Sequence, residues 1–461
     1  YQVPVFRSAD SLLRPVTALE DVWRNSAGLT WQPLGMLLLS GDLTSTRDLR
    51  RYADSTSLGR LAGESRRSFL GMDVGVERDR QLNTAWALTP RVTSWFHPRF
   101  TSQSAFVLSR SLSSREPIRT DGDTAGAFIL PQTLNNSRSY ELGTGVEVGR
   151  LLAGAFGDSS TIGRATRRIR PFDVSDRLTR NSTFDLAAFD PDLSYQLALG
   201  GLDHFLTQGS DSAIGAAEVR ATTFSSGADL PLGLSFTLGY SRTRTSRYQL
   251  VAGSFLTSES KQTEWPRGNV RLTRSLRRGP VSVVSLGTIF RTADGTTTTP
   301  SFGGAPIVSR LFSSTVTPDI QLTLRNGMVF SGSYNRLRQE TFTSGNLTRT
   351  SQNDITAGLT HAFNLPTSIS RIRRSIRSQF SGVLSRSTSC LQRQDIDQCL
   401  TISDTRRTEA RATFDSDLAR ILTGGLSFSY SLNEARHLDR KFSQIIITAS
   451  LEISLFSADY R

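Results

Sequence analysis

Few residues in this sequence have the types and spacing that catalysis would need. The tripeptide Gly157-Asp158-Ser159 places a serine beside an acidic residue, but no histidine motif accompanies it to supply a general base. The four histidines lie far apart, without the spacing of a metal-binding helix, at His97, His204, His361 and His437. We therefore predict no catalytic residue and expect that the chain is not an enzyme.

Ligands for ions and nucleotides are equally scarce. Asp190 and Asp192 place two carboxylates in one short loop, where they could contribute to a calcium site, but calcium takes about six to eight oxygen ligands. The segment Gly143-Thr144-Gly145 lies inside an alternating pattern, so it does not predict a phosphate-binding loop. We predict no metal and no cofactor.

The two cysteines, Cys390 and Cys399, are candidates for a disulfide. Eight residues separate them, within a polar segment at residues 387–402 that we expect to be a loop between two strands. A disulfide forms if this loop faces an oxidising compartment. The alternative is two unpaired thiols.

The composition excludes several classes of protein. The net charge is +13, and nearly all of the basic residues are arginine, since lysine occurs only at Lys261 and Lys441. The arginines are spread along the chain and form neither a patch nor a recognition helix, so we predict no nucleic-acid partner. No apolar run approaches the roughly 18 residues of a membrane-spanning helix.

The strongest pattern is an alternation of apolar with small or polar residues, which is typical of β-strands whose two faces differ. It is clearest at residues 70–77, 232–241, 426–432 and 444–455, and weaker at residues 82–88, 140–148, 320–324 and 355–363. Most of these segments run for about ten residues, close to the roughly 9–11 that a tilted strand needs to cross a bilayer.

Alternation alone also fits a soluble β-sandwich. The residue types on the two faces of the strands are needed to distinguish a sandwich from a membrane barrel. The polar face is largely Gly, Ser and Thr, and the apolar face often carries an aromatic residue near one end. This combination is typical of a membrane barrel with a polar lumen and aromatic girdles. We predict an all-β fold with a few helical loop insertions: an antiparallel transmembrane β-barrel of about 16 strands, or the C-terminal part of a very large one.

The two faces of these strands receive opposite roles under this prediction. We expect the lumen to be lined by Gly71, Asp73, Glu77, Ser235, Thr237, Ser427 and Ser429. We expect lipid to contact Leu234, Phe236, Leu238, Phe428, Tyr430, Ile447 and Leu451.

Glycine-containing turns divide the strands. Asn326-Gly327 predicts a type I′ hairpin turn, in which both central residues have positive φ. Gly424-Gly425 predicts another break between strands.

Two segments interrupt the alternation and are predicted to be insertions. Residues 45–68 predict a polar, partly helical loop. Residues 151–170 have helix-like spacing, with Ser159 or Ser160 as the N-cap, and predict a solvated loop helix. The alternative for this second insertion is contact of its arginines with anionic headgroups.

Part of the chain resembles a known family. Residues 311–363 contain a short polar strand that leads to a proline, a hairpin, a strand ending in Tyr-Asn and a glycine-containing return strand. Residues 219–240, 263–273 and 424–456 add a Leu-Pro-Leu-Gly strand opening, a Trp/Pro-bearing strand start and a final long hairpin. Together these patterns resemble the C-terminal region of the SprA family, the giant outer-membrane translocon of the type IX secretion system.

The resemblance implies a location, a function and partners. It implies that residues 1–461 are the C-terminal portion of a longer barrel, in the outer membrane of a Gram-negative-type bacterium, which passes folded secreted proteins through its lumen. The implied partners are outer-membrane lipids, the remaining strands of the same barrel, plug and gating proteins, and the secreted cargo. Two other classes stay open: an ordinary porin or receptor barrel for small solutes, and a soluble or surface-displayed β-rich structural protein.

Overall fold

The computed structural model describes residues 2–5, 16–19, 21–51, 57–69, 71–110, 118–119, 128–129, 132–156, 166–187, 189–301, 304–364, 375–393, 398–419 and 422–453. None of the helices in these ranges is long and apolar enough to cross a membrane.

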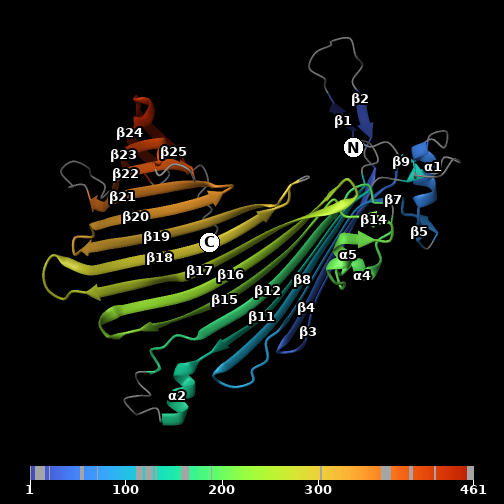
Figure 1. The fold of residues 1–461 in the computed structure, drawn as a ribbon, viewed down its shortest axis with the longest axis horizontal. Coiled ribbons are helices and arrows are strands. Elements are labelled where there is room, and N and C mark those ends of the chain that lie inside the picture. The colour runs from blue at the N-terminus through green and yellow to red at the C-terminus, as the bar shows by residue number, and fades with distance from the viewer. Residues whose placement is uncertain are drawn as a thin grey trace. The chain divides into compact units, whose positions relative to one another are not determined.

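Seventeen long strands form one antiparallel sheet (Figure 1). They are β3 (Val22–Leu34), β4 (Leu37–Asp48), β7 (Val76–Leu88), β8 (Phe96–Arg110), β11 (Gln132–Val146), β12 (Phe172–Phe184), β15 (Gly215–Asp229), β16 (Leu234–Val251), β17 (Ser254–Ser275), β18 (Val281–Thr299), β19 (Ile307–Leu324), β20 (Val329–Thr343), β21 (Asn346–Asn364), β22 (Ser375–Arg393), β23 (Leu400–Ala419), β24 (Leu422–Ala435) and β25 (Arg440–Ile453). The prediction of an all-β fold of antiparallel strands with a few helical insertions is confirmed.

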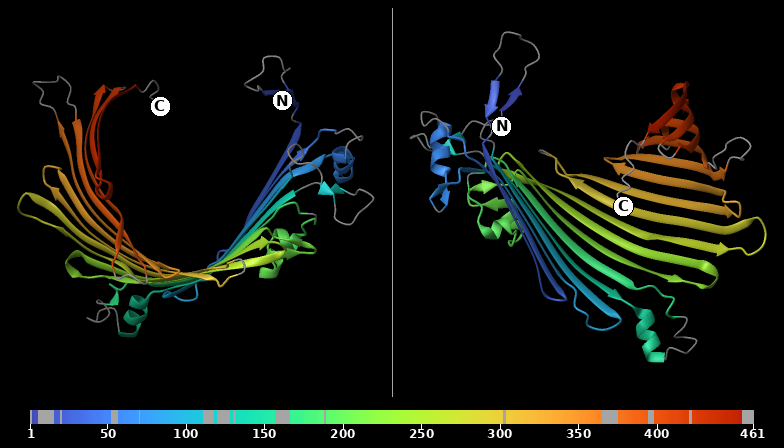
Figure 2. Two further views of the ribbon diagram at one scale, coloured as in Figure 1. Left: turned by 45° about the horizontal axis from the view of Figure 1, so that its top comes forward. Right: turned by 180° about the vertical axis from the view of Figure 1, so that it is seen from behind.

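The chain divides into two compact units. The first comprises residues 1–145, 174–222 and 243–259, and the second comprises residues 146–173, 223–242 and 260–461. In the first unit, β3, β4, β7 and β8 pair in sequence order. In the second unit, β18 to β25 pair in sequence order; Figure 2 shows these strands side by side, coloured from yellow to red.

The strands are longer than the alternation predicts. The main strands have 12 to 22 residues, where the sequence pattern suggested about ten. In β20, for example, Phe330 and Tyr334 are followed on the same face by Arg336 and Arg338, while the ladder to β21 continues unbroken. The apolar alternation therefore marks only part of such a strand, because backbone pairing continues where the same face becomes charged.

Hairpin turns of the type I′ class occur, but not where the sequence predicted one. Two-residue turns with positive φ at both positions join β16 to β17 at Ala252-Gly253 and β20 to β21 at Ser344-Gly345. The predicted turn at Asn326-Gly327 belongs to a four-residue connection in which only Gly327 has positive φ, at 83°. The type I′ prediction there is wrong because two extra residues relieve the tight geometry.

The first insertion begins and ends later than predicted, between β4 and β7, and contains more strand. Residues 45–48 complete β4, and the helix α1 spans Ser57–Ser65, which confirms the helical part. A two-stranded hairpin of β5 (Ser68–Phe69) and β6 (Met72–Asp73) follows, outside the seventeen-stranded sheet. The prediction of one continuous alternating strand at residues 70–77 is therefore wrong.

The second insertion begins earlier than predicted. The helix α2 spans Val148–Phe156, directly after β11. The proposed N-caps Ser159 and Ser160, like the tripeptide at residues 157–159, lie outside the described residues.

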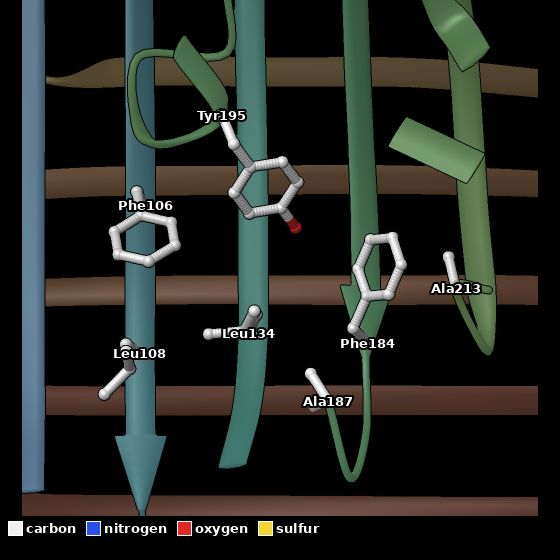
Figure 3. Packing of buried hydrophobic residues seen from close by; sticks show 7 residues of the cluster. All are labelled: Phe106, Leu108, Leu134, Phe184, Ala187, Tyr195 and Ala213. Atoms are coloured by element: carbon white, nitrogen blue, oxygen red, sulfur yellow. The ribbon is translucent and has the colours of Figure 1, made fainter. Parts of the chain in front are cut away.

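A third insertion, which the sequence analysis did not identify, carries a small hydrophobic core in the first unit. Residues 185–214 contain the helices α4 (Leu193–Gln196) and α5 (Leu202–Leu206) and the hairpin of β13 (Thr207–Gln208) and β14 (Asp211–Ser212). They cover one face of β8, β11 and β12 and bury a cluster, shown in Figure 3, of Phe106, Leu108, Leu134, Phe184, Ala187, Tyr195 and Ala213.

Candidate functional surface: a sheet with two unlike faces

The second unit has one continuous apolar face across its last strands. Residues opposite each other in paired strands share a face of the sheet. The register aligns one row of Leu322, Phe330, Leu359, Phe380, Ala412, Phe428 and Ile447. The next row is Ile320, Gly332, Ala357, Gly382, Ala410, Tyr430 and Ile445. We call the face that carries these rows the apolar face.

The apolar face is exposed over most of its width. Phe380 and Phe428 are each 41% exposed, and Ile447 is 67% exposed. Monomeric soluble proteins rarely leave contiguous apolar patches of this kind exposed to water.

The opposite face of the same strands, which we call the polar face, carries a hydrogen-bonded network around Asp354. Asn335 donates from Nδ2 to Asp354 Oδ2 at 3.1 Å, and Gln352 donates from Nε2 to the same oxygen at 2.9 Å. Ser385 donates to Asp354 Oδ1, and Thr317 donates to Asn335 Oδ1 at 2.9 Å. The network ties β19, β20, β21 and β22 together through side chains as well as backbone.

A concavity of about 480 Å³ lies farther along the polar face, over β22 to β25. Its lining is almost entirely polar: Gln379, Ser381, Arg411, Thr413, Asp415, Gly425, Leu426, Ser427, Thr448 and Ser450. Charges of both signs and short hydroxyls make this wall polar.

Two glycines on the polar face lie directly opposite charged residues. Gly287 is the register partner of Asp319, and a Cβ built on this glycine would lie 2.2 Å from Asp319 Oδ1. Gly425 is the partner of Asp415, whose Oδ1 would lie 3.0 Å from an added Cβ. The missing side chain makes room for the carboxylate. Both Gly424 and Gly425 lie inside β24. The predicted break between strands at Gly424-Gly425 is therefore wrong.

The predicted lipid-facing residues of the second unit lie on one face. Phe428 and Tyr430 pair with Ile447 and Ile445, and Leu451 lies on the same face opposite Gly424. In β16, Leu234, Phe236 and Leu238 alternate with polar residues, and Phe236 is exposed. The shared face is as predicted, and contact with lipid stays a prediction.

Four of the predicted lumen residues lie on the polar side. Ser427 and Ser429 pair with Thr413 and Arg411 on the polar face. In β16, Thr237 donates to Asn269 Oδ1 at 2.8 Å, and Ser235 donates to the Arg271 carbonyl at 3.5 Å. Whether these residues line a lumen stays a prediction.

The other three predicted lumen residues are placed differently. Gly71 lies in the turn between β5 and β6, with φ of 79°, and Asp73 lies in β6, so neither belongs to a strand of the large sheet. A hydrogen bond from the Gly75 backbone N–H, assisted by the Arg66 guanidinium, lowers the pKa of Asp73. Both residues form a local turn, and their assignment to a barrel strand is wrong.

Glu77 is turned toward the face that carries the apolar residues of the first unit. Its carboxylate accepts hydrogen bonds from Ser45 Oγ at 3.1 Å and from Arg80 Nε at 2.8 Å. Ser45 and Arg80 are register partners, two residues beyond the aligned pair Leu43 and Leu82. A register shift between Thr46 and Arg47 displaces the alternation at this point, so the predicted lumen orientation of Glu77 is wrong.

The first unit repeats the two-faced pattern. Leu29, Trp31 and Leu43 are exposed on the face that they share with Trp86 and Phe100. The rings of Trp86 and Phe100 lie 4.6 Å apart. Aromatic residues thus sit at one end of this apolar stripe, as in a girdle at a membrane interface.

The cysteines form the predicted disulfide. Cys390 and Cys399 are joined, with a Cα–Cα distance of 5.5 Å. Cys390 lies inside β22 and Cys399 directly precedes β23, so the predicted loop at residues 387–402 is largely strand. The bond closes the hairpin between these two strands.

The loop carboxylate Asp192 has a structural role. It caps α4 by accepting a hydrogen bond from the Tyr195 backbone N–H at 2.7 Å and another from Ser194 Oγ. These two hydrogen bonds lower the pKa of Asp192. No group of three or more metal-ligating side chains occurs among the described residues.

Sequence reasoning missed the residues that organise the polar face. Asp354 immediately precedes Ile355, the first residue of a weakly alternating segment, and Arg411 and Asp415 lie in β23, whose sequence mixes charges with small residues. The weak alternation that begins at Ile355 was the only signal near Asp354. Arg411 and Asp415 became visible through the register of β22, β23 and β24.

Comparisons with known proteins do not assign a family. No family model matches the chain, and no curated protein matches it. Among solved structures, the alcaligin outer-membrane receptor FauA from Bordetella pertussis is similar, with a TM-score of 0.35 and 9% identity over 94% of this chain and 74% of that chain. The β domain of the Bordetella autotransporter BrkA has a TM-score of 0.23 and 10% identity over 52% of this chain and 92% of its own. Similarity at this level does not carry a functional assignment.

Proposed function

We propose that this chain forms the wall of a β-barrel in a bacterial outer membrane, with the apolar face toward lipid and the polar face toward an aqueous lumen. The observation that carries this proposal is the in-register apolar face of β19 to β25, exposed and continuous over strands long enough to cross a bilayer. In hydrocarbon every backbone group needs an internal partner, and antiparallel ladders supply it.

Membrane fractionation tests this location. We expect the full-length product to stay with the outer-membrane fraction after alkaline carbonate and urea washes, and to be released by detergent. A product that is monodisperse in detergent-free buffer would contradict the proposal, because the apolar face would then be covered by protein.

The finer proposal concerns what passes through the lumen. The SprA-like pattern at residues 311–363 and at the last hairpin supports a role in exporting folded proteins as part of a type IX translocon, with plug and gating partners. The polar face suits a passive conduit, because its charges and hydroxyls hold water and offer no bond chemistry.

Two measurements separate a protein conduit from a small-solute pore. Single-channel recording of the full-length product should show conductance above that of ordinary porins once plugs are removed, and deletion of the gene should leave folded secreted proteins in the periplasm. Porin-like conductance without a secretion defect would support the small-solute alternative and reject the translocon.

A further inference from the structure

A row of cations borders the apolar face of the second unit. Two residues beyond the row that includes Tyr334, Leu384 and Leu432, the register aligns Arg336, Asn353, Arg386, Arg406, Glu434 and Lys441. Two residues of strand correspond to about 7 Å, so these side chains lie about 7 Å beyond the row that includes Tyr334. We call Arg336, Arg386, Arg406 and Lys441 the basic row.

A tyrosine marks the boundary between the apolar face and the basic row. The hydroxyl of Tyr334 donates to Asn353 Oδ1 at 2.9 Å, so its ring belongs to the apolar face and its hydroxyl reaches the basic row. This orientation is typical of aromatic residues at a membrane–water interface.

The basic row is only partly neutralised by carboxylates. Asp404 pairs with Arg386 at 3.1 Å, and Glu434 pairs with Lys441 at 3.3 Å. Among the described residues, no ion pair is formed by Arg336 or Arg406, both of which are exposed, although Glu434 is the register partner of Arg406. Arg338, one row farther from the apolar face, is also exposed and without an ion pair in this part of the chain.

Two members of the basic row place like charges at directly paired positions. Arg386 and Arg406 are direct register partners on adjacent strands, whose backbones lie about 5 Å apart. Like charges directly opposite each other destabilise a sheet. A phosphate between the two guanidiniums would turn the repulsion into two charge-assisted hydrogen bonds.

From these observations we propose that the basic row binds the phosphate groups of anionic lipids in the leaflet that borders it. The inference rests on the proposed membrane location and adds a ligand class to it. Arg386 and Arg406 form the centre of the site, Arg336 and Lys441 extend it along the sheet, and the fatty acyl chains of the same lipid lie against the apolar face.

A lipid-retention experiment tests the inference on the full-length protein. The protein is first reconstituted in phosphatidylcholine vesicles, and insertion is checked by protease protection. Native mass spectrometry then measures retention of bisphosphorylated lipid A and of the same lipid without its phosphates. We expect preference for the phosphorylated lipid, and weaker preference at high salt.

Matched double variants locate the site. Arg386→Gln with Arg406→Gln should lower the affinity for the phosphorylated lipid by about 25-fold, at about fivefold per cation. Arg407→Gln with Arg411→Gln removes the same charge from the polar face of β23 and should leave retention within about twofold. Arg406→Gln alone should be at least as stable as the parent protein in neutral detergent, because it removes the like-charge pair.

The possible outcomes separate the two proposals. Failure to insert into vesicles would overturn the membrane location, and with it the lipid site. Insertion with equal retention of both lipids, or equal loss in both double variants, would leave the membrane location intact and overturn the phosphate site.

Discussion

Two groups of strands, one in each unit, continue beyond their apolar residues in different ways. In the first unit, the insertion at residues 185–214 covers β8, β11 and β12, and the face beneath it is a dry core. In the second unit, the ends of β20 to β23 beyond the apolar rows carry exposed arginines. Where a strand continues beyond its apolar residues, its side chains can be covered by another part of the protein. Alternatively, the strand can carry charged side chains at that end.

Even the polar residues differ between the two regions. In β11, Gln132 donates to the Phe189 carbonyl at 2.6 Å, and Arg138 donates to the Leu197 carbonyl at 2.7 Å. These buried donors satisfy carbonyls of the insertion that water cannot reach. By contrast, Arg336, Arg338 and Arg406 of the second unit are exposed and form no ion pair among the described residues.

The largest expected effect is in the covered region. Phe106 is fully buried and packs edge-to-face against Tyr195, with ring centroids 6.0 Å apart. Phe106→Ala should destabilise the contact between the insertion and the sheet by about 3–5 kcal/mol, because it removes the aromatic contact and leaves a cavity. Hydrogen exchange across residues 193–206 measures the loss.

The exposed residue Val107, next in the same strand, provides the control for that prediction. Val107→Ala should change exchange in the insertion little. Equal effects of the two variants would show that the insertion does not depend on this core.

The apolar face of the second unit provides the next comparison. Phe428→Arg should cost about 2–4 kcal/mol of unfolding free energy in a bilayer, because it places a charge in hydrocarbon. Ser427→Arg, one residue away on the polar face, should cost much less. Urea unfolding in lipid vesicles measures both, and equal costs would count against the assignment of the two faces.

The disulfide closes one hairpin end in the second unit. Replacing Cys390 and Cys399 by serine should lower stability by about 2–3 kcal/mol in the chain-entropy account of a short closed loop. The loss should appear under oxidising conditions and vanish when the parent protein is compared in the presence of a reductant. Persistence of the difference in reductant would indicate that the serines disturb packing.

The smallest effect concerns the pH dependence of the insertion. The Tyr195 N–H and the Ser194 hydroxyl lower the pKa of Asp192 below its usual 3.8. This cap therefore contributes its full stability above pH 3.8, and the contribution is lost as the pH falls through the lower folded-state pKa. Carboxyl NMR should show the lowered pKa, and Ser194→Ala should move it back toward 3.8. An unchanged pKa in that variant would contradict the capping geometry.

Burial of Tyr195 in this core changes the pKa of its hydroxyl group. Removal from water raises the pKa of Tyr195 to about 12. The ring therefore stays neutral over the physiological range and contributes to the core through packing.

The sequence alone determined the β-class and the assignment of faces where alternation was strict. Phe428, Tyr430 and Ile447 were placed together because side chains in a strand alternate with a period of two, whatever the partner strand is. The disulfide could also be predicted from the sequence, because two cysteines in a short segment allow only one pairing. Alternation failed at Gly71, Asp73 and Glu77, where a local hairpin and a register shift change the period.

Only the tertiary structure decided which residues align across strands and which surfaces are covered. The insertion at residues 185–214 has short helices and no strong periodicity, so its contact with Phe106 and Phe184 depends on long-range packing. The row that places Arg386 opposite Arg406 likewise depends on register, because cross-strand neighbours are set by pairing and not by distance along the chain.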